Sequence, residues 1–145
     1  WSLGWRDVLS ILKSARVQVL QNRRIEFQGV TIAGVDDAID KRQDFSFLDE
    51  RGASRSLLSV LHEPDFVEEQ PRHVSLQLSG HSHGGQMCLP GGTPVHVPKY
   101  GRKYTAGFYG NLSVPLYVSR GVGTTSFDMR LFCPPEVSIL TLRSG

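Results

Sequence analysis

The chain has 145 residues, a formal net charge of +2 and a hydrophobic share of 39%. That length suits one domain, and the composition excludes wholesale disorder. The small net charge, without a long basic run, argues against nucleic-acid binding through bulk electrostatics. Cys88 and Cys133 lie far apart and form no CxxC, so we expect two ordinary, half-buried thiols.

The first part of the chain predicts a helix followed by short strands. Apolar residues recur at helical spacing from Trp1 to Lys13, which favours an amphipathic helix. A strand is predicted at 17–20. A hairpin is predicted from strands at 25–27 and 30–35, joined by Gln28-Gly29. A short helix is expected within 44–52.

Two apolar runs, Ser56 to Leu61 and Val74 to Ser79, are typical of strands covered on both faces. Further strand candidates, separated by Gly and Pro clusters, lie at 95–97, 104–109, 116–119 and 137–142. Buried strands alternating with short helices predict an α/β fold with a central, partly parallel sheet. In such sheets, ligands bind at the carboxyl ends of the strands.

The segment Gly80-His81-Ser82-His83-Gly84-Gly85-Gln86 gives the strongest local signal. Two imidazoles at i and i+2 can point to the same side of an extended segment, and the glycines allow a close turn. Neutral imidazole is a ligand for transition ions such as zinc or iron. His62, like His81, directly follows an apolar strand, so neighbouring parallel strands would bring both rings to one edge. The alternative for His62 alone is a buried histidine with a backbone hydrogen bond.

Other polar residues allow structural explanations. His73 and His96 lack a strand-end or glycine context, and we expect both to face solvent. Asp36 and Asp37 follow a strand, where carboxylates could bind metal, but backbone hydrogen bonds within a loop are favoured. Arg102, in Tyr100 to Tyr104, could contact phosphate or belong to a solvated loop.

Several of these motifs together resemble the calcineurin-like metallophosphoesterases. Leu61-His62-Glu63-Pro64-Asp65 and the segment from Leu78 to Gln86 are similar to the last two metal motifs of that family. Four further stretches resemble a bacterial branch of simple phosphodiesterases: Ile32 to Asp37, Tyr100 to Tyr104, Tyr117 to Gly123 and Cys133 to Glu136.

The resemblance implies the C-terminal half of a four-layer α/β/β/α sandwich, with two metal ions (Mn, Fe or Zn) at the sheet edge. It implies that His62 and His81 bind one ion and His83 the other, and that a metal-activated hydroxide attacks a small-molecule phosphoester. Gly80 and Arg102 are candidate substrate contacts.

The sequence departs from the family pattern in one respect. The early Asp-x-His, the bridging Asp and the Asn-His pair that supplies the acid are absent from it. We therefore expect residues 1–145 to be the C-terminal portion of one domain, inactive or nearly so alone. The missing half, or an oligomer contact, is expected to cover the exposed sheet. The compartment is not determined, although relatives in that branch often carry an N-terminal segment, which favours a membrane-associated setting over a cytoplasmic one.

Two other functional interpretations remain open at the level of sequence. A non-catalytic module could keep the sandwich and use its surface to hold a partner. A single-zinc site could use only the three histidines and keep an open position. Metal content would separate an enzyme from a scaffold.

Overall fold

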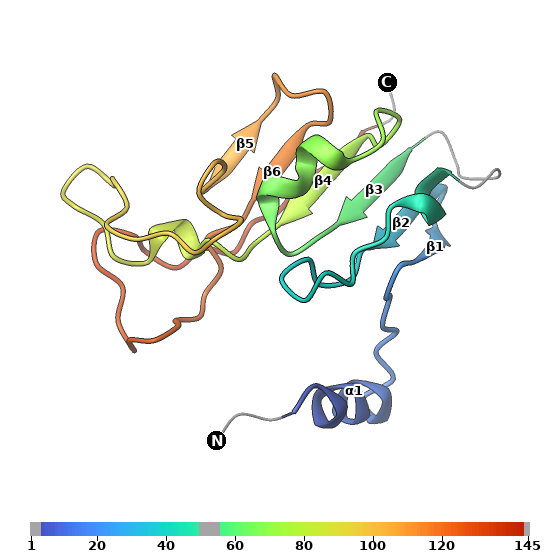
Figure 1. Cartoon of the computed structure of the whole chain (residues 1–145), viewed down its shortest axis with the longest axis horizontal. Coiled ribbons are helices and arrows are strands. Elements are labelled where there is room, and N and C mark those ends of the chain that lie inside the picture. Colours follow the sequence, from blue (N-terminus) through green and yellow to red (C-terminus); the bar gives the residue numbers. More distant parts are fainter. Residues whose placement is uncertain (1–3, 50–55, 144–145) are drawn as a thin grey trace.

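The computed structural model describes residues 4–49 and 56–143, which build one six-stranded sheet (Figure 1). β1 (Arg23–Phe27) and β2 (Val30–Gly34) form the predicted antiparallel hairpin. Gln28 and Gly29 have φ angles of 49° and 80°. Two positive φ angles in a two-residue loop match the twist of a hairpin, and glycine adopts them without strain.

The centre of the sheet is parallel, as predicted. β3 (Leu57–Val60), β4 (Leu76–Ser79) and β6 (Leu116–Val118) run parallel to β2, and β5 (Gly107–Tyr109) is antiparallel to β6. The strand order is β1-β2-β3-β4-β6-β5. The carboxyl ends of the parallel strands therefore meet at one edge. The long loops after β4 and β6 form a lobe beyond that edge (Figure 1).

One face of the sheet carries the core. Two short 3-10 helices, η1 (Ser46–Asp49) and η2 (Pro64–Glu69), lie over it (Figure 1). Leu57, Leu61 and Leu116 are each at most 1% exposed. Burial of a leucine side chain contributes roughly 1.5–3 kcal/mol, so this face supplies much of the stability.

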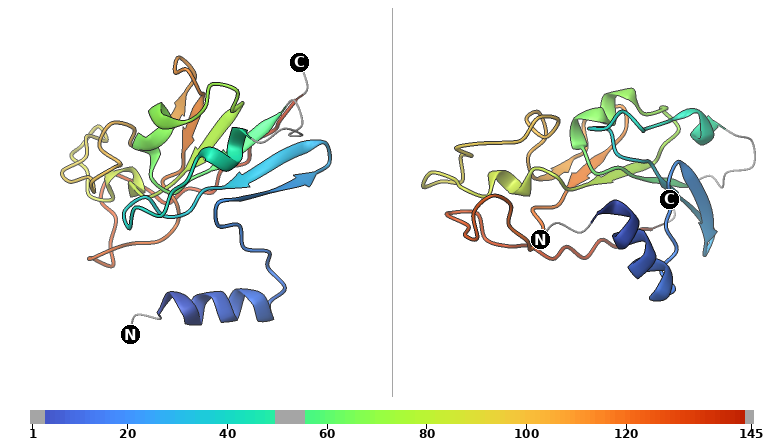
Figure 2. Two further views of the ribbon diagram at one scale, coloured as in Figure 1. Left: turned by 45° about the vertical axis from the view of Figure 1, so that its right-hand side comes forward. Right: turned by 60° about the horizontal axis from the view of Figure 1, so that its bottom comes forward.

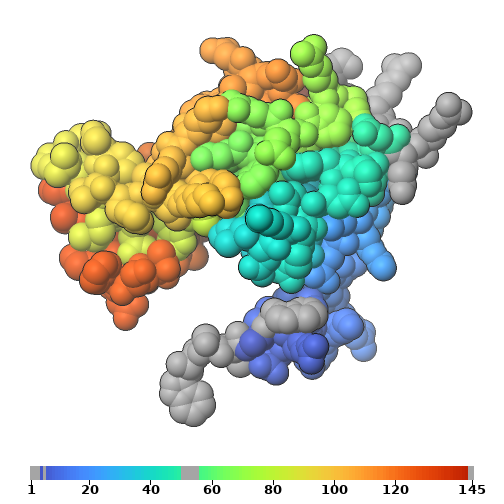
Figure 3. All heavy atoms as spheres, viewed as in Figure 1, coloured from blue at the N-terminus to red at the C-terminus, as the bar shows by residue number. Residues whose placement is uncertain are grey.

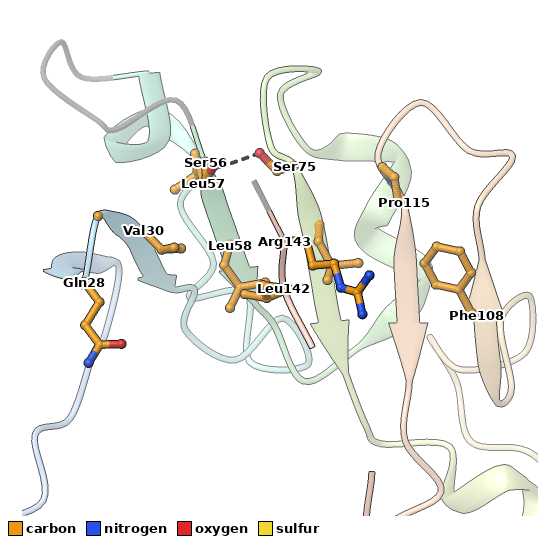
Figure 4. A pocket seen from close by; sticks show the side chains of 12 residues that line it. Gln28, Val30, Ser56, Leu57, Leu58, Ser75, Phe108, Pro115, Leu142 and Arg143 are labelled. Carbon is orange, nitrogen blue, oxygen red and sulfur yellow. Dashed lines mark hydrogen bonds between the residues drawn. The ribbon is translucent and has the colours of Figure 1, made fainter. Parts of the chain in front are cut away.

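The opposite face is largely open, contrary to the prediction that β3 is covered on both faces. Leu57 and Ser59 are buried, whereas Val60 is 42% exposed. Residues 136–143 cross this face, and a cavity of about 550 Å³ lies between them and the strands (Figure 4). One face of β3 is therefore buried, and the other is only partly covered by the described residues.

Three predicted strands are wrong. Residues 17–20 are extended but unpaired, and Leu20 instead packs against Gly34. Residues 95–97 belong to a loop beside the isolated bridge between Cys88 and Pro94. Residues 137–142 have strand-like composition but no strand partner in the described part of the chain. A β-strand exists only through its ladder, which composition alone does not reveal.

The predicted N-terminal helix is α1 (Trp5–Ser14), which stands apart from the sheet (Figures 2 and 3). Its residues Val8 and Ile11 are 41% and 52% exposed, so its apolar stripe has no cover from the described residues. The first three residues of the predicted helix lie outside the described range, as do residues 50–52 of the helix predicted within 44–52. No helix in residues 4–49 or 56–143 is long and apolar enough to cross a bilayer.

The α/β class is therefore confirmed, with one mixed sheet and helical turns on one face. The four-layer sandwich, and the placement of the chain as its C-terminal half, stay predictions.

Candidate metal centre

Backbone hydrogen bonds carry the sheet up to the histidines themselves. Beyond the last residues of β3 and β4, the Leu61 amide donates to the Leu78 carbonyl at 3.1 Å, and the Gly80 amide donates to the His62 carbonyl at 3.1 Å. His62 and His81 therefore follow directly on two paired strands. Their ring centroids are 5.1 Å apart, and the ring planes meet at 71°. The structure brings these two predicted residues together.

A buried network of polar side chains supports the carboxyl ends of β3 and β4. The Gln70 side-chain amide donates to the Gln77 side chain at 2.9 Å, and the Gln77 amide donates to the Ser79 hydroxyl at 2.9 Å. That hydroxyl donates to the Leu61 carbonyl at 2.6 Å. The network links η2, β4 and the residue before His62, so it fixes the relative position of the two strand ends.

Glu63 lies beside His62 and His81, and we did not single it out from the sequence. Its side chain is fully buried, and one carboxylate oxygen accepts from the Ala38 amide at 3.2 Å. The other oxygen, Oε1, has no hydrogen-bond partner among the described residues. Potential ligand atoms of His62, Glu63 and His81 all lie within 4.8 Å of one another. A signal was present in the sequence, since a carboxylate follows the histidine at a strand end.

His81 is oriented by the loop that follows. One ring nitrogen, Nε2, lies 2.7 Å from the Lys99 carbonyl oxygen. A carbonyl can only accept, so Nε2 carries a proton, and in the neutral ring Nδ1 has the free lone pair. A histidine that donates one N–H to a carbonyl and offers the other nitrogen is the common arrangement in metal sites.

His83 lies one turn further, in η3 (His83–Gly85), outside the group of three. Its φ of 53° is unusual for a residue other than glycine, and its Nδ1 is buried with no hydrogen-bond partner in residues 4–49 or 56–143. Its carbonyl oxygen accepts from Arg130 Nη1 at 3.0 Å and from Cys133 Sγ at 3.3 Å. These two hydrogen bonds hold the loop that carries His83 in place.

The surroundings of two of the imidazoles lower their pKa and so favour the neutral ring. Burial lowers the pKa of His62, aided by the nearby His81 and His83 rings and opposed by the charges of Glu63 and Asp37. Burial also lowers the pKa of His83, and the Arg130 guanidinium acts in the same direction. A neutral imidazole has the free lone pair that a metal ion needs.

A pocket of about 410 Å³ opens beside the histidines. His81 and His83 both line it, together with His96, Met87 and Phe127. His96 is exposed, as predicted, but it lies on the rim of this pocket, which sequence reasoning did not anticipate. Its signal was weak, because no motif surrounds it.

The two candidate substrate contacts fall in different places. Gly80 lies against His62, where a β-carbon would stand 3.7 Å from the ring Nδ1. Arg102 is exposed and lines a shallow pocket of about 300 Å³ that it shares with His96. Its backbone amide donates to Asp65 at 3.1 Å, which anchors the loop.

The remaining polar residues have structural partners. Asp36 accepts from the Asp37 amide at 2.8 Å, and Asp37 accepts from the Asp40 amide at 2.9 Å, as expected for loop carboxylates. His73 is exposed, and its Nε2 lies 3.1 Å from the Leu48 carbonyl oxygen. Cys88 and Cys133 are more buried than expected, and both thiols donate to the Gly84 carbonyl, at 3.4 and 3.3 Å.

Several known proteins with similar sequences are named metallophosphoesterase or phosphodiesterase. The uncharacterized metallophosphoesterase YkuE of Bacillus subtilis is 41% identical over 118 residues, which cover 79% of this chain and 41% of YkuE. An uncharacterized metallophosphoesterase of Aquifex aeolicus is 31% identical, over 97% of this chain and 56% of that protein. Phosphodiesterase YaeI of Escherichia coli is 36% identical, over 59% of this chain and 32% of YaeI.

The chain belongs to the calcineurin-like metallophosphoesterase superfamily. It spans about half the length, or less, of the curated metallophosphoesterases that it matches here. No family model and no solved structure matches it.

Proposed function

We propose that the protein hydrolyses a small-molecule phosphoester at a two-metal site, to which this chain contributes His62, His81 and His83. The observation that carries the proposal is the meeting of the His62 and His81 rings, with centroids 5.1 Å apart, at the carboxyl edge of the sheet. Relatives named metallophosphoesterase and phosphodiesterase support the reaction class.

The donor set suits the proposed cofactors. Two histidines with a buried carboxylate beside them form a nitrogen and oxygen environment of the kind that Mn, Fe and Zn accept. His62 and His81 would hold one ion and His83 the other. When bound, such ions lower the pKa of a water molecule and offset the negative charge of the phosphate.

Other residues of the chain would position the substrate. The lack of a side chain at Gly80 leaves space beside His62 for a phosphate oxygen. The pocket next to His81 and His83 would receive the organic group of the ester. Arg102 would meet a phosphate oxygen only after its loop moves toward the histidines, because it lines a separate pocket.

We further propose that the general acid and the bridging carboxylate lie outside residues 1–145. None of the Asp-x-His, Gly-Asp and Gly-Asn-His patterns expected for them occurs in the sequence. The segment that supplies them would also cover the open face of the sheet. A binuclear site lacking its bridging carboxylate would hold two dications poorly, because their charge is not offset.

Hydrolysis of bis-p-nitrophenyl phosphate with Mn²⁺ tests the proposal. The natural protein, with any segment that precedes Trp1, is expected to turn over the substrate, and His81→Asn should reduce kcat by at least 100-fold. His73→Asn is the matched control, because His73 is exposed and lies next to Leu48, a residue of η1, away from the strand ends. Residues 1–145 alone should show no turnover above the metal blank.

Two results would contradict the proposal. Clear turnover by residues 1–145 alone would show that no outside acid or carboxylate is needed. A natural protein that binds metal ions but hydrolyses no phosphomonoester or phosphodiester would favour the non-catalytic scaffold instead.

A further inference from the structure

Glu63 presents a buried carboxylate oxygen for which the described residues offer no partner. The side chain is 0% exposed, Oε2 accepts a single amide hydrogen bond from Ala38 at 3.2 Å, and Oε1 accepts none. Buried carboxylates are normally paired with a cation, met by several donors or bound to a metal ion. The position of Glu63 therefore requires an explanation that packing does not give.

The neighbours of this oxygen are the two imidazoles. One ligand atom from each of His62, Glu63 and His81 lies within 4.8 Å of the other two. Ligand atoms bound to one zinc ion stand about 2.0–2.2 Å from it. Around such an ion the ligand atoms would be roughly 3.4–4.2 Å apart, so side-chain rotations must bring atoms that now lie within 4.8 Å somewhat closer together.

The backbone holds the three residues at this spacing. The amide of Gly80 is bonded to the carbonyl of His62, which ties the two histidine-bearing segments together. The Nε2–H group of His81 already donates a hydrogen bond to the Lys99 carbonyl, which leaves Nδ1 for a bond to a metal ion. The group is thus ordered without an ion, which lowers the entropic cost of binding one.

We propose that His62, Glu63 and His81 form a three-ligand site for one transition-metal ion that is complete within this chain. The proposal rests on the proposed function for the use of the two imidazoles, and it adds Glu63 as the third ligand. Two histidines and one carboxylate leave positions open for water or substrate, as in catalytic zinc and iron sites. The carboxylate offsets one of the two charges of the ion, which three imidazoles would not do.

Metal titration of residues 1–145 tests this without any assay of hydrolysis. Calorimetry with Zn²⁺, and visible absorption with Co²⁺, should each show one ion bound tightly per chain at pH 7. His62→Asn, Glu63→Gln and His81→Asn should each weaken binding by at least tenfold. Glu63→Gln keeps the volume of the side chain and an oxygen that can accept from Ala38.

Two control variants isolate the site. Glu69→Gln makes the same chemical change at an exposed position and should leave the affinity within twofold. His73→Asn removes an exposed histidine that lies next to Leu48, away from the strand ends, and should also leave the affinity within about twofold. Circular dichroism and thermal unfolding of each metal-free variant establish that it is folded.

X-ray absorption of the unaltered, Zn²⁺-loaded chain gives a second measurement that needs no variant. Two imidazoles in the first coordination shell are expected, together with oxygen ligands. Three imidazoles would overturn the proposal in favour of a site that uses His83. Unchanged affinity in folded Glu63→Gln, or no tight binding by the unaltered chain, would also overturn it. A natural protein that binds the ion in this way yet hydrolyses nothing would leave this proposal standing and refute only the proposed function.

Discussion

Arg130 connects the loop that carries His83 to the rest of the lobe. Its guanidinium donates to the carbonyl oxygens of His83 at 3.0 Å, Arg120 at 2.7 Å and Gly121 at 3.2 Å. It also donates to the Gly123 carbonyl at 2.8 Å. One partly buried cation thus satisfies carbonyl groups from several turns, and this allows the loop to hold His83 at a positive φ.

Replacement of Arg130 by Met should lower the free energy of unfolding by about 2–3 kcal/mol, because hydrogen bonds to a charged donor are lost and carbonyls stay unsatisfied. Urea denaturation followed by circular dichroism measures the change. Arg72→Met, at an exposed arginine, is the control and should cost no more than about 0.5 kcal/mol. Equal losses for both variants would show that the Arg130 hydrogen bonds contribute nothing net.

The C-terminal segment is attached to β6 by a small polar cluster. The Tyr117 hydroxyl donates to Glu136 at 2.7 Å, and the Ser138 hydroxyl donates to the same oxygen at 2.8 Å. These hydrogen bonds from Tyr117 and Ser138 hold the pKa of the Glu136 carboxyl below its ordinary value. The segment is thereby held across the open face although it forms no strand.

The lowered pKa of Glu136 makes the stability of the chain depend on pH. A carboxyl whose pKa is lower in the folded than in the unfolded state stabilises the fold above its unfolded pKa. That contribution is lost as the pH falls through the folded pKa. Glu136→Gln should therefore flatten the loss of thermal stability between about pH 5 and pH 3. Glu69→Gln is the control, and an unchanged slope in Glu136→Gln would contradict the expected linkage.

Most elements of the sheet could be predicted from local sequence, because their signals are local. The turn at Gln28-Gly29 and the apolar runs of β3 and β4 led to the correct strands and to the parallel centre. Residues 137–142 have the same composition but no partner, so their prediction as a strand failed. Glu63 was missed for a related reason. Its proximity to His81 depends on the pairing of two strands that are far apart in the sequence, and local sequence does not reveal that pairing.

At the scale of the whole molecule, the described residues cover one side of the sheet fully and the other only in part. Val137 and Ile139 are 82% and 92% exposed, and Val60 on β3 is 42% exposed. Exposed apolar area of this kind favours association, with another chain or with another segment of the same protein. The cavity of about 550 Å³ on this side lies far from the histidines, at the opposite ends of the strands (Figure 4).

Residues 1–145 alone should therefore associate weakly, with an average mass in sedimentation equilibrium that rises with concentration. The double variant Val137→Ser with Ile139→Ser should reduce this association, because it removes apolar area from the open side. Val95→Ser is the control, since Val95 is 66% exposed but lies in the lobe. A strictly monomeric unaltered chain, or equal effects of both changes, would show that the open side is not the associating surface.

The backbone hydrogen bond from the Gly80 amide to the His62 carbonyl limits how related sequences can differ. Because this hydrogen bond extends the strand pairing to the two histidines, the spacing of the two rings follows from the roughly 4.8 Å that separates neighbouring strands. Sequence changes in the surrounding loops can then occur without disturbing the ring pair. Insertions within β3 or β4, by contrast, would shift one ring past the other and abolish the pairing in a single step.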